Sequence, residues 1–145
     1  LISYPPSPAP TPANHSTNTM ADSSASTSAD GPTLQNRWKA AGGFFEQYTH
    51  QSSSSQTPMR FTIFLPPQAT SKPVPILYYL SGLTCTDENG VQKGFVQFQA
   101  AKRGLAIVCP DTSPRGAGVE GEDEGWDFGT GAGFYVDATA EKWKK

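Results

Sequence analysis

The pattern of apolar and polar positions predicts strands in the middle of the chain. In residues 59–65 the apolar side chains of Phe61, Ile63 and Leu65 fall on one face, and the polar side chains of Arg60 and Thr62 fall on the other. This alternation predicts a half-buried strand, which ends at the two prolines that follow. Upstream, residues 37–50 contain a Gly-Gly pair followed by aromatic residues, and a run of serines comes next. That pattern favours a first strand and a flexible hairpin loop.

Two short runs, residues 74–80 and 105–109, are continuously apolar and are bounded by Gly, Pro or Asp. Such runs are typical of the buried strands of a parallel sheet. Between them, apolar residues recur at spacings of four and three and predict one amphipathic helix, with Thr86 or Asp87 as its cap and Gly104 at its end. The apolar positions of this helix are Val91, Phe95, Phe98 and Ala101. A strand, a helix and a second strand form a βαβ unit, so the predicted fold class is α/β.

The flanking segments have different compositions. Residues 1–35 are rich in Pro, Ser, Thr and Ala and predict a disordered, low-complexity tail, which leaves residues 36–145 as the folded part. Residues 116–139 mix glycines, acids and aromatic residues without a helical or strand period. This composition predicts a long surface loop near a site.

Charge and cysteine content exclude several classes of protein. The net charge of -2 and the pI near 5.6 offer no basic surface for nucleic acid or for an anionic membrane. The sequence has neither a long apolar run nor the charged-then-apolar order of a secretory signal. Cys85 and Cys109 do not form a metal-binding motif, so we expect free thiols in a reducing compartment, and therefore a cytoplasmic protein.

In α/β sheets, ligands gather at the carboxyl ends of the strands, so the loops after the two apolar strands are the first candidates. The loop at 81–86 contains Gly82 and suits either an oxyanion-binding turn or a plain turn that caps the next helix. Ser81 lacks the preceding Gly-x of a nucleophile elbow, and no His is placed to activate Cys85. The loop at 111–116 suits an Asx turn with an exposed arginine.

Two further patterns are set aside. The glycines at 129–133 do not fit the dinucleotide fingerprint, because Phe134 stands where a glycine is needed. The acidic residues at 120–124 have no neighbouring His and predict a solvated loop, so no metal site is expected.

Three strings are distinctive when taken in order: LSGLTCT at 80–86, PDTSPRG at 110–116 and GEDEGWDFGTGAGFYVDAT at 121–139. With them, residues 36–145 closely resemble the S-formylglutathione hydrolase family, also called esterase D. The resemblance implies hydrolysis of the thioester S-formylglutathione by a Ser-His-Asp triad, without a metal or organic cofactor. It implies that Leu83 supplies an oxyanion-hole N–H, and it leaves a homodimer of the complete protein open. The residues that it places near the site are Gly82, Thr84, Cys85, Trp126, Phe128 and Tyr135.

The sequence departs from the family pattern in two places. Gly90 stands where the family commonly has an aromatic residue, and we expect it to loosen the start of the helix. No Gly-x-Ser-x-Gly motif occurs anywhere, so none of the triad is recognised. We therefore expect the N-terminal portion of an α/β-hydrolase fold that is inactive by itself. A related carboxylesterase with another acyl substrate, and a truncated non-catalytic chain that pairs with another subunit, remain as alternatives.

Overall fold

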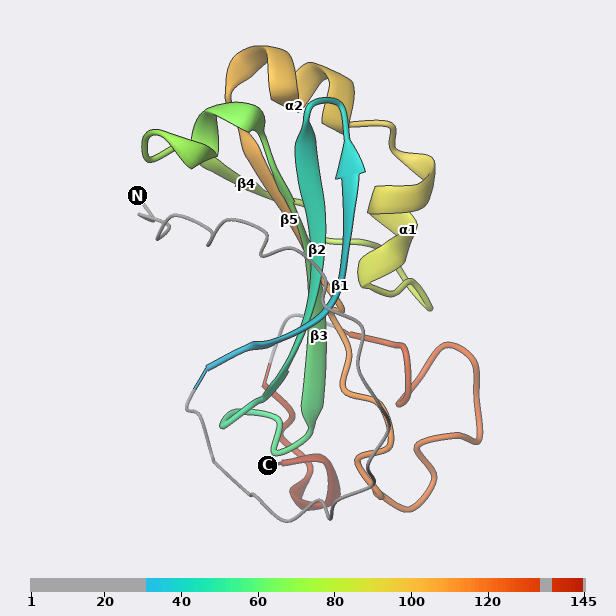
Figure 1. Ribbon diagram of the computed structural model, residues 1–145. Helices are drawn as coiled ribbons and strands as arrows, with labels where there is room; N and C mark the ends of the chain where they lie inside the picture. Colours follow the sequence, from blue (N-terminus) through green and yellow to red (C-terminus); the bar gives the residue numbers. More distant parts are fainter. Residues whose placement is uncertain (1–30, 134–136, 145) are drawn as a thin grey trace, which may run out of the picture.

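The computed structural model describes residues 31–133 and 137–144, which form a mixed five-stranded sheet with two short helices (Figure 1). The strand order is β1-β2-β3-β5-β4, and all neighbours are antiparallel except β4 and β5, which are parallel. Helix α1 packs on β3 and β5, and α2 packs on β5. The α/β class is therefore confirmed.

The first three strands form an antiparallel meander. They are β1 (Thr33–Ala40), β2 (Gly43–Gln51) and β3 (Pro58–Leu65). The prediction of a single strand over 37–50 was wrong, because Ala41 and Gly42 both have positive φ angles, 47° and 80°, and make a two-residue hairpin turn. Strand β1 also begins at Thr33, inside the segment expected to be a tail, because its backbone pairs with β2 as far as Thr49.

A βαβ unit follows the meander and a 3-10 turn at Pro67–Thr70. It consists of β4 (Ile76–Tyr78), α1 (Asp87–Lys93), α2 (Gln97–Arg103) and β5 (Ala106–Pro110). The parallel pairing of the two predicted apolar strands is confirmed. The prediction of a single helix is wrong. The helix is interrupted at Gly94 and Phe95, and Phe95 adopts a positive φ of 48°. The expected end at Gly104 is confirmed, with a left-handed φ of 62°.

The break in the helix changes which residues are buried. Phe95 and Phe98, expected on the apolar face, are 67% and 56% exposed, whereas Val91 and Ala100 are buried. On the sheet, the helices cover the face that carries Phe64 and Thr62, both fully buried. The expectation that the opposite side chains of β3 form its buried face was therefore wrong, since all three are only partly buried. The core cluster consists of Phe45, Phe64, Val91, Ala100, Ile107 and Cys109.

The two parallel strands differ in exposure. Strand β5 lies between β3 and β4, and four of its five residues are buried. Strand β4 lies at the edge of the sheet and is shorter than the predicted run, with Leu77 and Tyr78 49% and 64% exposed. The prediction that residues 74–80 are buried is thus wrong, apart from Val74, which is buried, and Ile76, which is partly buried.

The segment after β5 occupies the end of the sheet opposite α2 (Figure 1). Its described residues between 116 and 139 contain no helix or strand, as predicted, and a short 3-10 turn, Glu141–Trp143, follows. One acid of the expected solvated run, Glu122, is buried and accepts a hydrogen bond from the Gly118 N–H at 2.8 Å. In the described part of the chain, no helix has the length and apolar character needed to cross a membrane.

Candidate functional site

A tight turn follows β4, at residues 82–85. The Cys85 N–H donates to the Gly82 carbonyl at 3.1 Å and closes the turn. Thr84 has a φ of 63°, a left-handed conformation that is strained for a β-branched residue. Its N–H donates to the Gly131 carbonyl at 2.8 Å, so a contact from outside the turn helps to hold the strained residue.

The turn leads directly into α1 through a capping box. The Thr86 hydroxyl accepts from the Glu88 N–H at 3.2 Å, and the Asn89 side-chain oxygen accepts from the Thr86 N–H at 2.9 Å. These two contacts pair backbone donors that the first turn of a helix leaves free. Thr86, rather than Asp87, is therefore the cap, and α1 contains Gly90; the loosening of the helix start by Gly90 stays a prediction. A Cβ placed on Gly90 would lie 2.7 Å from the Tyr79 ring, so the ring occupies the space of a side chain there.

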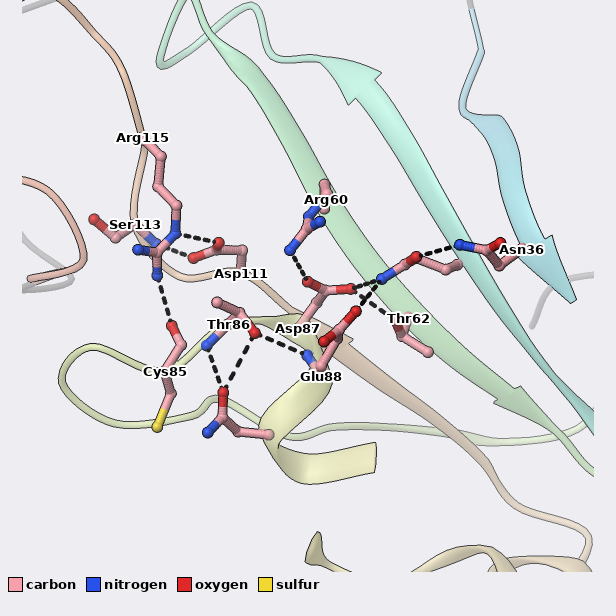
Figure 2. A network of polar contacts seen from close by, with 12 residues as sticks. Asn36, Arg60, Thr62, Cys85, Thr86, Asp87, Glu88, Asp111, Ser113 and Arg115 are labelled. Atoms are coloured by element: carbon pink, nitrogen blue, oxygen red, sulfur yellow. Dashed lines mark hydrogen bonds and ion pairs between the residues drawn. The ribbon is translucent and has the colours of Figure 1, made fainter. Parts of the chain in front are cut away.

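The loop after β5 reaches back to this turn. The Asp111 carboxylate accepts from the Ser113 N–H at 3.1 Å, which confirms the predicted Asx turn. The expected exposed arginine is instead a bridge: Arg115 Nε donates to Asp111 Oδ2 at 2.7 Å, and Nη2 donates to the Cys85 carbonyl at 2.9 Å (Figure 2). The loops that follow the two parallel strands are thus joined by one side chain.

Gly131 joins the third segment to the other two. Its N–H donates to the Ser113 hydroxyl at 3.0 Å, and its carbonyl accepts from Thr84. Its φ is 82°, and a Cβ at this position would lie 3.2 Å from Arg115 Nη1. Both facts favour glycine here. Three segments far apart in the sequence therefore meet at the carboxyl ends of β4 and β5.

Leu83 lies at the centre of this constellation. The hydrogen bonds described above engage the backbone of Gly82, Thr84, Cys85 and Thr86, whereas the Leu83 N–H makes none with any residue of 31–133 or 137–144. Leu83 is 44% exposed. A fixed, unpaired N–H in a turn is the kind of donor that stabilises a developing oxyanion, because it needs no reorganisation as charge forms.

A buried polar network lies beneath the start of α1. The Asp87 side chain is fully buried and accepts hydrogen bonds from the Thr62 hydroxyl at 2.7 Å and from Gln47 Nε2 at 2.8 Å. Arg60 forms an ion pair with the same carboxylate at 3.1 Å. Figure 2 shows how these contacts tie α1 to β2 and β3. A buried charge needs such partners, so the network fixes where the helix and the preceding turn sit on the sheet.

Sequence reasoning did not find this network, nor the roles of Ser113, Arg115 and Gly131. The sequence indicates Asp87 only as a possible cap, and nothing in the local pattern links it to Thr62 on a distant strand. The only available signal was the Asp111–Arg115 spacing after a buried strand, which is also typical of an exposed turn.

The two cysteines are free thiols. Cys109, in β5, is buried, and burial raises its pKa from 9.0 to about 11, with a further contribution from the Asp87 charge. Its thiol is therefore protonated and unreactive at neutral pH. Cys85 is half-buried at the end of the turn, whereas His50, the one histidine of the described residues, packs against Phe61 on the sheet. No group of His, Cys, Asp or Glu in the described ranges is arranged to hold a metal ion.

Two of the aromatic residues expected near the site, Trp126 and Phe128, precede Gly131 on the third segment. Trp126 is 73% exposed, and Phe128 packs edge-on against Trp143 with ring centroids 5.0 Å apart. Phe128, Trp143 and Ser113 border a hollow of about 1210 Å³, which Leu83 does not line. Tyr135 lies outside the described residues. The structure therefore brings together Gly82, Leu83, Thr84 and Cys85, and the nearness of the aromatic residues to a substrate stays a prediction.

Comparison with known proteins identifies the family. The model of the "Putative esterase" family matches residues 52–145, more than half of the chain and all three segments of the site. The chain belongs to this esterase family.

The most informative relatives of this esterase sequence carry one name. The chain is 52% identical over 103 residues to the S-formylglutathione hydrolase of Mus musculus and 54% identical over 105 residues to that of Paracoccus denitrificans. These matches cover 71% and 72% of the chain, but only 36% and 37% of the relatives. Among solved structures, an S-formylglutathione hydrolase from Agrobacterium tumefaciens is 45% identical with a TM-score of 0.72, over 76% of this chain and 40% of that one. The expected resemblance and the α/β-hydrolase fold are confirmed, and the esterase chain spans little more than a third of the curated relatives.

Proposed function

We propose that the protein carrying this sequence is an S-formylglutathione hydrolase, which converts the thioester to formate and glutathione. The observation that carries the proposal is the identity of about half of the aligned residues with relatives of that name. The geometry supports it, because the unpaired Leu83 N–H sits in a turn held by hydrogen bonds on both sides.

The 145 residues supply part of the reaction. During attack on a thioester, a nucleophile adds to the carbonyl carbon and negative charge develops on the carbonyl oxygen. The Leu83 N–H donates a hydrogen bond to that oxygen. When the carbonyl re-forms, the carbon–sulfur bond breaks, and the departing glutathione sulfur takes the proton that the nucleophile lost and becomes a thiol. Water then hydrolyses the acyl-enzyme and releases formate. We propose that the nucleophile and its base come from sequence beyond these residues, since no Gly-x-Ser-x-Gly motif occurs here and the relatives are longer.

An assay of two proteins tests the proposal. We expect the protein expressed at the length of its relatives to hydrolyse S-formylglutathione faster than simple acetyl esters, and the 145-residue chain alone to hydrolyse neither. A preference for acetyl esters in the longer protein would indicate a carboxylesterase with another substrate. Turnover by the short chain that is lost on changing a residue within 36–145 would contradict the proposed division of labour.

We also place the protein in the cytoplasm, and its partner is the small molecule S-formylglutathione. Two free cysteines, one of them partly accessible, suit a reducing compartment. A fluorescent fusion of the longer protein found in an organelle lumen would contradict this location. The homodimer that the family resemblance leaves open stays a prediction, which light scattering of the longer protein decides.

A further inference from the structure

Arg115 makes two contacts that meet in the turn. Its Nε is 2.7 Å from Asp111 Oδ2, and its Nη2 is 2.9 Å from the Cys85 carbonyl oxygen. The Asp111 carboxylate is buried and is itself fixed, because its other oxygen accepts from the Ser113 N–H. The fixed Asp111 carboxylate therefore orients the Arg115 guanidinium on one side, and the guanidinium donates a hydrogen bond to the Cys85 carbonyl on the other.

The shape of the guanidinium matters for this bridge. Its N–H groups project in a fixed plane, so one group can bind a carboxylate and a carbonyl at once with defined directions. A lysine at the same position would offer a single ammonium on a flexible stem. The space is also limited, since a Cβ at Gly131 would already lie 3.2 Å from Arg115 Nη1.

The bonded carbonyl belongs to the residue that closes the turn. The Cys85 N–H donates to the Gly82 carbonyl, and the Cys85 carbonyl accepts from Arg115. Leu83 lies in the turn between Gly82 and Cys85. Thr84, next to Leu83, is held in a strained conformation. We propose that Arg115 is a positioning residue, which acts through the Cys85 carbonyl to fix the direction of the Leu83 N–H. This inference rests on the proposed function, and it assigns Asp111 the task of orienting Arg115.

Variants of the longer protein test the inference. We expect Arg115→Gln to lower kcat for S-formylglutathione by about 10-fold to 100-fold, with KM changed by less than about 2-fold, because misplaced catalytic groups weaken transition-state contacts more than substrate binding. Arg115→Lys should fall between Arg115→Gln and wild type. Arg103→Gln is the matched control, because it removes the same charge from an exposed position on α2, where the side-chain hydrogen bonds of Arg103 among the described residues go to Gln99 alone.

Hydrogen exchange gives a second readout that does not depend on activity. In Arg115→Gln, we expect faster exchange of the amides of Thr84, Cys85 and Thr86, and unchanged exchange in β2 and β3. Unchanged exchange in the turn would overturn the inference, and so would an unchanged kcat in an active enzyme. A wild-type protein that does not hydrolyse S-formylglutathione would instead sink the proposed function, and the catalytic part of this inference with it.

Discussion

At the scale of single residues, the proposed site uses one backbone donor, the Leu83 N–H, which lies beside a strained residue. In the proposed function Leu83 contributes its N–H rather than its side chain. Thr84 adopts a φ of 63°, which costs on the order of 1–3 kcal/mol. Hydrogen bonds with Gly131 and Arg115, which lie in two other loops, help to offset this strain. The backbone at this position is therefore set by its surroundings more than by its own sequence.

Leu83→Pro tests the donor directly in the longer protein. Leu83 is the second residue of the turn, a position that proline favours, so the substitution removes the N–H with little cost to the turn. We expect kcat for S-formylglutathione to fall by roughly 100-fold to 1000-fold, as for the loss of other oxyanion donors.

Leu83→Ala is the matched control, because it removes the side chain and keeps the N–H. It should retain activity close to wild type, with the same circular dichroism spectrum as Leu83→Pro. Equal kcat values for the two folded variants would rule out the assignment of Leu83 as a donor.

Local chemistry accounts for the residues that the sequence predicted well. The Thr86 cap, the Gly104 end and the Asx turn at Asp111 each depend on neighbours within a few positions, so their patterns are visible in the sequence. Arg115 and Asp87 depend on partners 30 and 25 residues away along the chain, Cys85 and Thr62. Such contacts exist only once the fold has formed, and spacing alone does not indicate them.

At the scale of elements, the sequence predicted a strand that is buried on both faces correctly. It failed for elements whose buried side depends on contacts with distant parts of the chain. Strand β5 was predicted correctly because a short apolar run inside a sheet is distinctive. The helical period over 91–101 was misleading, because the φ angle of Phe95 is positive and interrupts the helix. Phe95 and Phe98 are exposed as a result. In β3, the buried face is the one that carries Thr62, which donates a hydrogen bond to the buried Asp87 carboxylate on α1. The alternation of apolar and polar residues along β3 does not predict a buried acid on a neighbouring helix.

The buried Cys109 thiol, between β5 and α1, predicts that the free energy of unfolding falls at alkaline pH. Cys109 has a pKa of about 11 in the folded protein against 9.0 ordinarily, so the folded state binds the thiol proton more tightly. The stabilisation is complete below pH 9 and is lost as the pH rises from 9 towards about 11, where unfolding releases a proton. Urea unfolding of the longer protein across this range should show a steeper decline for wild type than for Cys109→Ala.

The second thiol provides the control for that measurement. Cys85→Ala should keep the alkaline decline of the wild type, because it leaves Cys109 in place between β5 and α1. The same slope in Cys109→Ala and wild type would mean that the buried thiol does not contribute.

At the scale of the whole molecule, the sheet has an unfinished appearance on one side. Strand β4 pairs only with β5 in the described sheet, and apolar side chains are exposed along it and just beyond. They are Leu77, Tyr78, Tyr79 and Leu80, each at least 43% exposed. An edge of this kind favours association with other strands.

We therefore expect the isolated 145-residue chain to aggregate, and Tyr78→Lys to reduce that aggregation by placing a charge on the edge. In the longer protein, the same substitution should lower the unfolding midpoint, because further sequence would cover the edge. Gln92→Lys, which adds a charge at an exposed position of α1, should change neither property by as much. Light scattering and thermal unfolding of the two lengths provide the measurements, and equal effects of the two lysines would argue against an adhesive edge.

The strand order also determines how the protein can be made. Strand β4 leaves the ribosome before β5, yet β5 must lie between it and the finished meander. At synthesis rates of about 5–20 residues per second, residues 79–105 take roughly 1–5 seconds to emerge. For that interval β3 and β4 each await the same partner, and the nascent chain presents two open strand edges at once. Synonymous codons that slow translation between Tyr79 and Leu105 would prolong this exposure and increase the demand for chaperones, without changing a single amino acid.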